Sequence, residues 1–148
     1  MPEARSFEYA IVRVVPRVER GERFNAGVIV WCRSLDWLRA GIELDRARLA
    51  ALAPDADVAL IESHLDSLAR VAAGTDDAGP IGRLSAAERF RWLVAPRSTV
   101  IQVSEVHEGL CEDPDAFLAH LMATLVRTPL TPGAGGAKGT AGPEAPNR

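Results

Sequence analysis

The chain has 148 residues, of which 47% are hydrophobic and 25% charged, and its formal net charge is −3. This size and composition are sufficient for one domain with a buried core. The acidic balance argues against a general duplex nucleic-acid binder, and the 5% aromatic content leaves few platforms for stacking single-stranded bases. With no secretory leader, no long apolar run and too few cysteines for a disulfide framework, we expect a soluble, bacterial, cytoplasmic domain.

Three strand-like segments in a row open the chain. Residues 7–15 are rich in β-formers and end at Pro16, which cannot donate a ladder hydrogen bond. Residues 24–32 are almost all apolar, as in a strand buried on both faces, whereas residues 37–44 alternate between the two faces. A tight turn at residues 33–36 joins the second segment to the third. Short connections between consecutive strands predict an antiparallel meander.

Helical spacing replaces the strand pattern in the middle of the chain. Asp45 is a suitable N-cap for a short helix that reaches residue 53, and a longer helix should begin near Asp57. Gly74 stands where the residue after a helix C-terminus belongs. These signals predict two helices, separated by the break at Pro54.

The last third of the chain carries equally local signals. Ser85 and Glu88 form a capping box for a helix that reaches about residue 94, before Pro96. A fourth strand is expected over residues 99–104. The final helix, over residues 112–127, should begin with Asp113 as cap and Pro114 at its first position, as their residue types favour.

The predicted order is β-β-β-α-α-α-β-α, an α+β fold in which helices pack on one face of a small antiparallel sheet. An open alternative is that the fourth strand joins a separate sheet edge. We expect residues 1–128 to form a single domain. Residues 129–148 are rich in Gly, Pro and Ala without apolar periodicity, which predicts a disordered tail.

Arginine supplies almost all of the positive charge, because Lys138 is the only lysine among the 17 basic residues. Guanidinium groups suit carboxylates and phosphates. A first candidate anion site is the connection between the first two strands, together with the strand residues beside it. Its candidate residues are Arg13, Arg17, Arg20 and Asn25. The alternative is a solvated loop in which these arginines pair weakly with Glu19 and Glu22.

A polar residue followed by glycine interrupts the second apolar segment at Asn25 and Gly27. Glycine in a strand is typical of a β-bulge or of a close approach between backbones. We therefore expect one of these two features at Gly27.

The second candidate anion segment spans residues 89–99. Arg89, Arg97 and Ser98 could bring donors together near the junction of helix and strand. Alternatively, Arg97 satisfies carbonyl groups at the helix end, which is a common placement. Trp37 and Trp92 are candidate anchors for a protein partner.

Metal and catalytic signatures are not found in the sequence. His107 and Cys111 are four residues apart, but no further ligands stand at zinc spacing. Phosphate-loop, dinucleotide-binding, nucleophile-elbow and zinc-protease motifs are missing. We therefore predict no metal and no cofactor, and we place catalysis below binding.

Two segments resemble the bacterial domain-of-unknown-function family 3037. The first comprises residues 7–16, 19–22 and 24–28; the second comprises residues 89–92 and 95–102, followed by an acidic stretch before the last helix. The resemblance covers about residues 5–128. It implies a small cytosolic accessory domain and, as one option, a partner of a HipA-like kinase, and it supplies no catalytic residues.

Three functional hypotheses follow from these patterns. The first is a non-catalytic binding module with an arginine-lined site for a phosphate or a carboxylate. The second is a protein-interaction or regulatory partner, for which the resemblance suggests a HipA-like kinase. The third and lowest is a small enzyme acting on nucleotides or phosphoesters.

Overall fold

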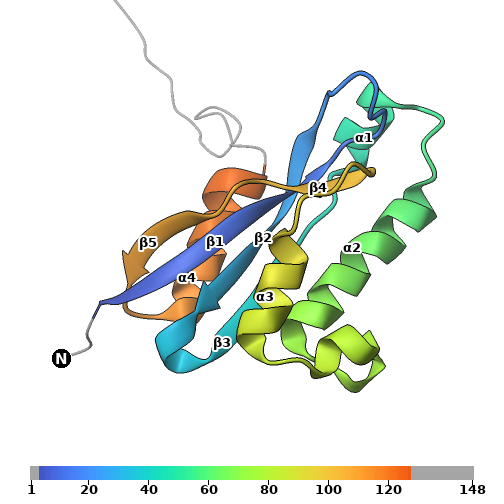
Figure 1. The fold of residues 1–148 in the computed structure, drawn as a ribbon. Helices are drawn as coiled ribbons and strands as arrows, with labels where there is room; N and C mark the ends of the chain where they lie inside the picture. Colours follow the sequence, from blue (N-terminus) through green and yellow to red (C-terminus); the bar gives the residue numbers. More distant parts are fainter. Residues whose placement is uncertain (1–3, 128–148) are drawn as a thin grey trace, which may run out of the picture.

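The computed structural model describes residues 4–127 and contains one antiparallel sheet of five strands (Figure 1). The strands are β1 (Arg5–Val14), β2 (Phe24–Cys32), β3 (Trp37–Ile42), β4 (Ile101–Val103) and β5 (His107–Cys111). Their order is β3-β2-β1-β4, and β5 also pairs with β1. The sheet and its helices confirm the α+β class, and the first three strands form the predicted meander.

The expected irregularity in β2 is present. Val12 pairs with Gly27 and Arg13 with Asn25, so Ala26 is an extra residue in β2, as in a β-bulge. Gly27 also lies against β3: a Cβ atom there would overlap the carbonyl oxygen of Gly41. Gly27 is thus a point at which two neighbouring backbones approach each other closely.

The fourth predicted strand is shorter than expected, and a fifth strand follows it. β4 pairs with the end of β1, and β5 pairs with its beginning. The buried Ser104 lies between β4 and β5 and is hydrogen-bonded to β1. Its Oγ accepts from the Ile11 N–H at 2.8 Å, and its N–H donates to the Ile11 carbonyl at 2.9 Å. The fourth strand therefore joins the main sheet, and the alternative of a separate edge is wrong.

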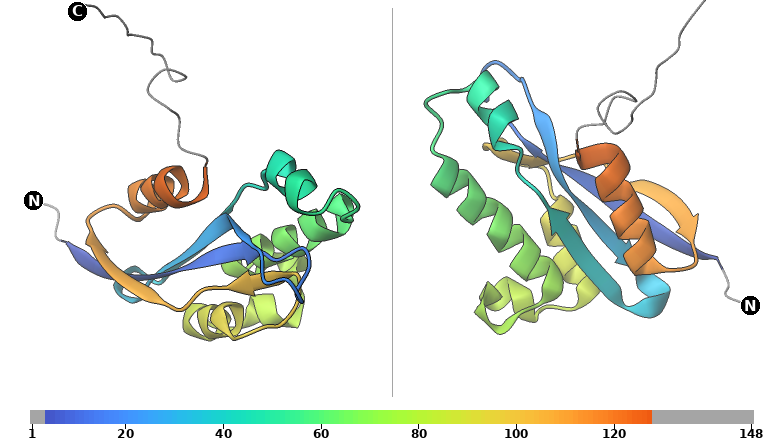
Figure 2. Two further views of the ribbon diagram at one scale, coloured as in Figure 1. Left: turned by 90° about the horizontal axis from the view of Figure 1, so that it is seen from above. Right: turned by 180° about the vertical axis from the view of Figure 1, so that it is seen from behind.

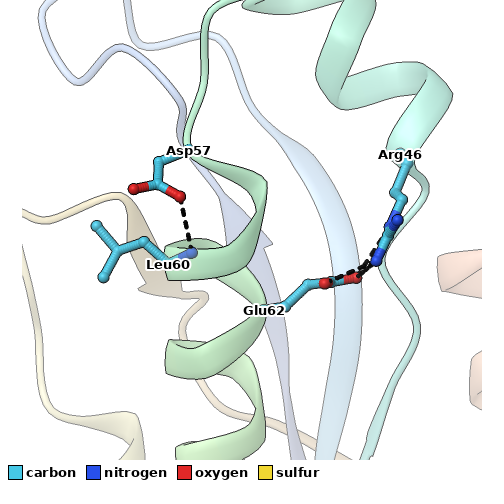
Figure 3. Close-up of polar contacts among 4 residues, drawn as sticks. All are labelled: Arg46, Asp57, Leu60 and Glu62. Atoms are coloured by element: carbon cyan, nitrogen blue, oxygen red, sulfur yellow. Dashed lines mark hydrogen bonds and ion pairs between the residues drawn. The ribbon is translucent and has the colours of Figure 1, made fainter.

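Four α-helices accompany the sheet, and local capping sets their starts. They are α1 (Arg46–Leu52), α2 (Val58–Ala73), α3 (Ala86–Val94) and α4 (Pro114–Leu121), with 3-10 turns at Arg33–Leu35, Asp76–Ala78 and Pro80–Arg83 and a π-helical turn at Met122–Val126. Asp45, Asp57 and Asp113 accept main-chain N–H bonds as predicted, and Ser85 forms the capping box with Glu88. Figure 3 shows the Asp57 cap, together with the Arg46–Glu62 ion pair that joins α1 to α2.

The helices cover both faces of the sheet, which corrects the expectation of helices on one face only. α2 and α3 lie on one side, and α4 lies on the other (Figure 2). α1 contributes Leu49 to the same core as α2 and α3. The reason lies in β2, where Ile29 belongs to the core beneath α2 and α3, while Val28 and Val30 belong to the core beneath α4. A strand that is apolar on both faces requires a cover on each.

Two further expectations concern the ends of the chain and the membrane. No helix within residues 4–127 combines the length and apolar character that crossing a bilayer would require. The predicted tail, residues 129–148, lies outside the described residues.

Candidate functional site: a groove around Arg97

A groove of about 250 Å³ lies where the end of α3 and the start of β4 meet α2. We call it the Arg97 groove. It is lined by His64, Ser67, Leu68, Trp92, Arg97, Thr99 and Ile101. Two of the sequence candidates, Arg97 and Trp92, therefore lie together in one site.

Local geometry holds Arg97 in place. Pro96 follows the end of α3, and the Arg97 side chain turns back toward the last turn of that helix. Its Nη1 donates to the Leu93 carbonyl at 2.7 Å, and its Nη2 donates to the Trp92 carbonyl at 3.0 Å. The guanidinium also lies 4.9 Å from the centre of the Trp92 ring, within cation–π distance. The predicted contact with helix-end carbonyls is thus present.

The charge of Arg97 is not neutralised within the described residues. Burial lowers the pKa of its guanidinium, yet an arginine remains protonated at neutral pH. None of the ion pairs among residues 4–127 includes it. The two carbonyl bonds use only part of its donor set, so N–H groups remain available for a bound anion.

The other groove residues supply an apolar floor and a polar rim. Leu68 and Ile101 are buried, whereas His64 and Ser67 on α2 and Thr99 before β4 are exposed. The Thr99 hydroxyl donates to the Ile101 carbonyl at 2.9 Å. The arrangement suits a small ligand with an anionic group at Arg97 and an apolar part against the floor.

Arg89, in the same sequence segment, has structural partners. Its Nη1 donates to the Val71 and Ala72 carbonyls at 3.0 and 2.6 Å, and its Nε donates to the Leu84 carbonyl at 3.0 Å. These bonds hold the C-terminus of α2 against the start of α3. Ser98 is exposed beside the groove and is not among its lining residues.

Two arginines of the first segment, Arg17 and Arg20, pair with carboxylates in solvent. Arg17 lies 2.6 Å from Asp55, and Arg20 lies 2.7 Å from Glu22. The hydrogen bond in the second pair raises the pKa of Arg20 and lowers that of Glu22. Both pairs are exposed and contribute little to stability.

Arg13 and Asn25 are cross-strand neighbours on β1 and β2. The Asn25 amide donates to the Leu125 carbonyl at 2.8 Å and so ties β2 to the turn after α4. Trp37 is half-buried in the core cluster beneath α4. None of these three residues lines the Arg97 groove.

The two arginine segments are neighbours in space, but their side chains have different partners. The Val15 N–H donates to the Val100 carbonyl at 2.7 Å, which brings the two main chains together. No residue of the first segment lines the Arg97 groove. Thr99 belongs to the second candidate segment, whereas sequence reasoning missed His64 and Ser67 as groove residues. The only available signal was that His64 and Ser67 lie three residues apart, on one face of a helix.

Metal-ligating and nucleophilic groups are dispersed in the part of the chain that the structure describes. Residues 4–127 contain no group of three or more His, Cys, Asp or Glu side chains that could hold a metal ion. Within the same residues, no hydrogen bond joins a serine, threonine or cysteine side chain to a histidine ring. Cys32 is buried, and burial raises the pKa of the Cys111 thiol, which disfavours its thiolate.

The fold and the groove define a small α+β domain that presents a positively charged, partly apolar groove. The chain belongs to the family described as protein of unknown function, DUF3037, whose family model matches residues 9–126. This match confirms the resemblance of the two arginine-bearing segments. Comparison with curated proteins and with solved structures gave no significant match.

Proposed function

We propose that this protein is a binding module for a small anionic ligand, a carboxylate or a phosphate monoester, held by Arg97. One observation carries the proposal: the Arg97 guanidinium is fixed by two carbonyls and an aromatic ring, and it has no carboxylate partner within the described residues. A cation already held in position loses little side-chain entropy when an anion binds.

The chemistry of the groove sets the expected size of the effect. A charge-assisted hydrogen bond contributes roughly 1.5–3 kcal/mol, so the loss of such a contact should weaken binding about ten- to a hundredfold. His64 lines the same groove and adds a polar side chain to its rim. Leu68 and Ile101 favour anions that carry an apolar group over inorganic phosphate.

The test is a thermal-unfolding and calorimetric panel of carboxylates and phosphate monoesters, with Arg97→Lys as the variant. At a hundred times its dissociation constant a ligand adds about 2.7 kcal/mol, or about 5–10 °C in midpoint for this chain length. Arg97→Lys keeps the charge but loses the planar fork, so we expect binding at least about tenfold weaker. Arg91→Ala is the matched control, because it removes an exposed arginine of α3 that does not line the groove.

Two results would contradict the proposal. One is the absence of any saturable response across the panel. The other is an equal loss of affinity in Arg91→Ala and Arg97→Lys, which would show that the response does not depend specifically on the groove.

A second candidate function, binding of a partner protein, rests on the exposed strand β5. Within residues 4–127, β5 pairs with β1 alone, and its Leu110 is 72% exposed. An edge strand with an exposed apolar side chain suits strand addition by a partner. The family resemblance suggests a HipA-like kinase as that partner.

Coexpression with such a kinase tests this second function. We expect Leu110→Lys to abolish copurification, since it places a charge at the exposed apolar position of the edge. Leu60→Lys, at a 49% exposed position on α2, should copurify as the parent does. Copurification that survives Leu110→Lys would remove β5 from the interface.

A further inference from the structure

A second cavity, of about 300 Å³, lies at the other end of β1 from the Arg97 groove. We call it the Arg33 pocket. It is lined by Arg5, Ser6, Glu8, Trp31, Arg33 and Ser34. These residues come from the start of β1, the end of β2 and the turn after β2. The Arg97 groove, in contrast, adjoins β4, which pairs with the last residues of β1.

The pocket exists because the helical cover ends over β2. Trp31 packs against Phe90 of α3, with ring centres 4.9 Å apart. Glu8 is the neighbour of Trp31 on β1, and Glu108 is the next neighbour on β5, so all three point to the same face of the sheet. Trp31 is 5% exposed, whereas Glu108 is exposed to solvent, so this face loses its cover between β2 and β5.

Arg33 is oriented in this pocket by the ring of Trp31. Its guanidinium carbon lies 4.9 Å from the ring centre, within cation–π distance. Ser34 follows it, and the Ser34 hydroxyl lies 3.4 Å from the Cys32 sulfur, which steadies the turn. Among the ion pairs within residues 4–127, none includes Arg33, Arg5 or Glu8.

The pocket thus holds charges of both signs that the described residues do not neutralise. Arg33 and Arg5 would attract a carboxylate, and Glu8 would attract an ammonium group. A simple anion would leave Glu8 without a partner in the pocket, and a simple amine would leave the two arginines without one. The volume is at the lower end of small-molecule sites, which begin at roughly 300 Å³.

We infer that the Arg33 pocket binds a small zwitterion of the α-amino-acid type. Its carboxylate is held by Arg33 with Arg5 beside it, and its ammonium group is held by Glu8. This site is separate from the Arg97 groove, whose lining residues include no carboxylate. The two sites share no lining residue, so substitutions in one test it without altering the other.

The experiment uses the full chain and free L-α-amino acids as probes, followed by calorimetry and amide NMR shifts. Each amino acid is compared with its N-acetyl form, which lacks the ammonium, and with its amide, which lacks the carboxylate. We expect at least one free amino acid to saturate at millimolar concentration and to shift the amides of Glu8 and Arg33. Both blocked forms should bind at least about tenfold more weakly, since each loses one charge-assisted contact.

Two variants separate the charge roles. Arg33→Ala should weaken the binding of the free amino acid and of the N-acetyl form alike, about tenfold or more. Glu8→Gln should weaken the binding of the free amino acid only, so that the preference of the pocket for the free over the N-acetyl form disappears. Arg83→Ala, which removes an exposed arginine outside the pocket, should leave binding unchanged.

Three results would overturn the inference. The first is no saturable shift with any amino acid in the folded parent protein. The second is a preference for the free amino acid that survives Glu8→Gln. The third is a set of shifts centred on Trp92 and abolished by Arg97→Lys, which would assign the binding to the Arg97 groove.

Discussion

Gly27→Ala is expected to destabilise the protein by about 3 kcal/mol, or roughly 10 °C in unfolding midpoint. A Cβ at this position would overlap the Gly41 carbonyl oxygen and would lie 2.7 Å from the Ile42 Cδ1. The first contact is with the main chain of β3, so a side-chain rotation cannot relieve it. The two strands would have to separate, although they are hydrogen-bonded neighbours in the meander. Urea unfolding of the purified variant measures the change.

Gly21→Ala is the control for this prediction. Gly21 has a φ of +72°, and a Cβ added there would have no neighbour within 4 Å, so alanine meets backbone strain without overlap. A cost of about 1 kcal/mol is expected from the left-handed conformation alone. If Gly27→Ala unfolded no more easily than Gly21→Ala, the close approach between β2 and β3 would be refuted.

Arg89→Ala is expected to cost about 3 kcal/mol, the second large effect. The substitution removes the bonds to the Val71, Ala72 and Leu84 carbonyls. Bonds from a charged donor contribute roughly 1.5–3 kcal/mol each, and part of this is recovered because water can reach the freed carbonyls. Hydrogen exchange should show faster opening of the last turn of α2, where two of the three acceptors lie.

Arg89→Lys and Arg91→Ala are the comparison variants for the stability change in Arg89→Ala. Lysine keeps the charge but cannot reach the three carbonyls with one planar group, so it should recover less than half of the loss. Arg91 is exposed on the same helix and makes no ion pair within residues 4–127, so its removal should change stability by less than about 0.5 kcal/mol. An unchanged free energy of unfolding in Arg89→Ala would show that the α2 terminus does not depend on this side chain.

The helix starts could be predicted from sequence because capping is local. Asp57 accepts from the N–H three residues later, and Ser85 exchanges bonds with Glu88 at the same spacing. Such contacts form as soon as the first turn of the helix forms, whatever else the chain does. The irregularity at Gly27 was equally visible, because a glycine inside an apolar strand is typical of a bulge or a close backbone approach.

The fifth strand and the face of the sheet that α4 covers could not be predicted from local sequence signals. β5 includes Glu108, Gly109 and the exposed Leu110, and it lacks the apolar alternation that marks a half-buried strand. Its main-chain bonds to β1 define it. The apolar stripe of α4 shows that one side of the helix is buried, but it carries no information on which face of the sheet it covers.

The sequence by itself determined the α+β class, the meander, the helix caps and the membership of the family, since these depend on residues close together in the chain. Only the tertiary structure decided what each arginine does. Arg89 and Arg97 lie in the same arginine-bearing segment of the sequence. In the fold, Arg89 binds carbonyls at the end of α2, whereas Arg97 lines a groove. Arg33, in the turn after β2, lines a pocket together with Glu8 of β1. A guanidinium on a long, flexible stem takes its partners from whatever the fold brings within reach, and that is set by contacts distant in sequence.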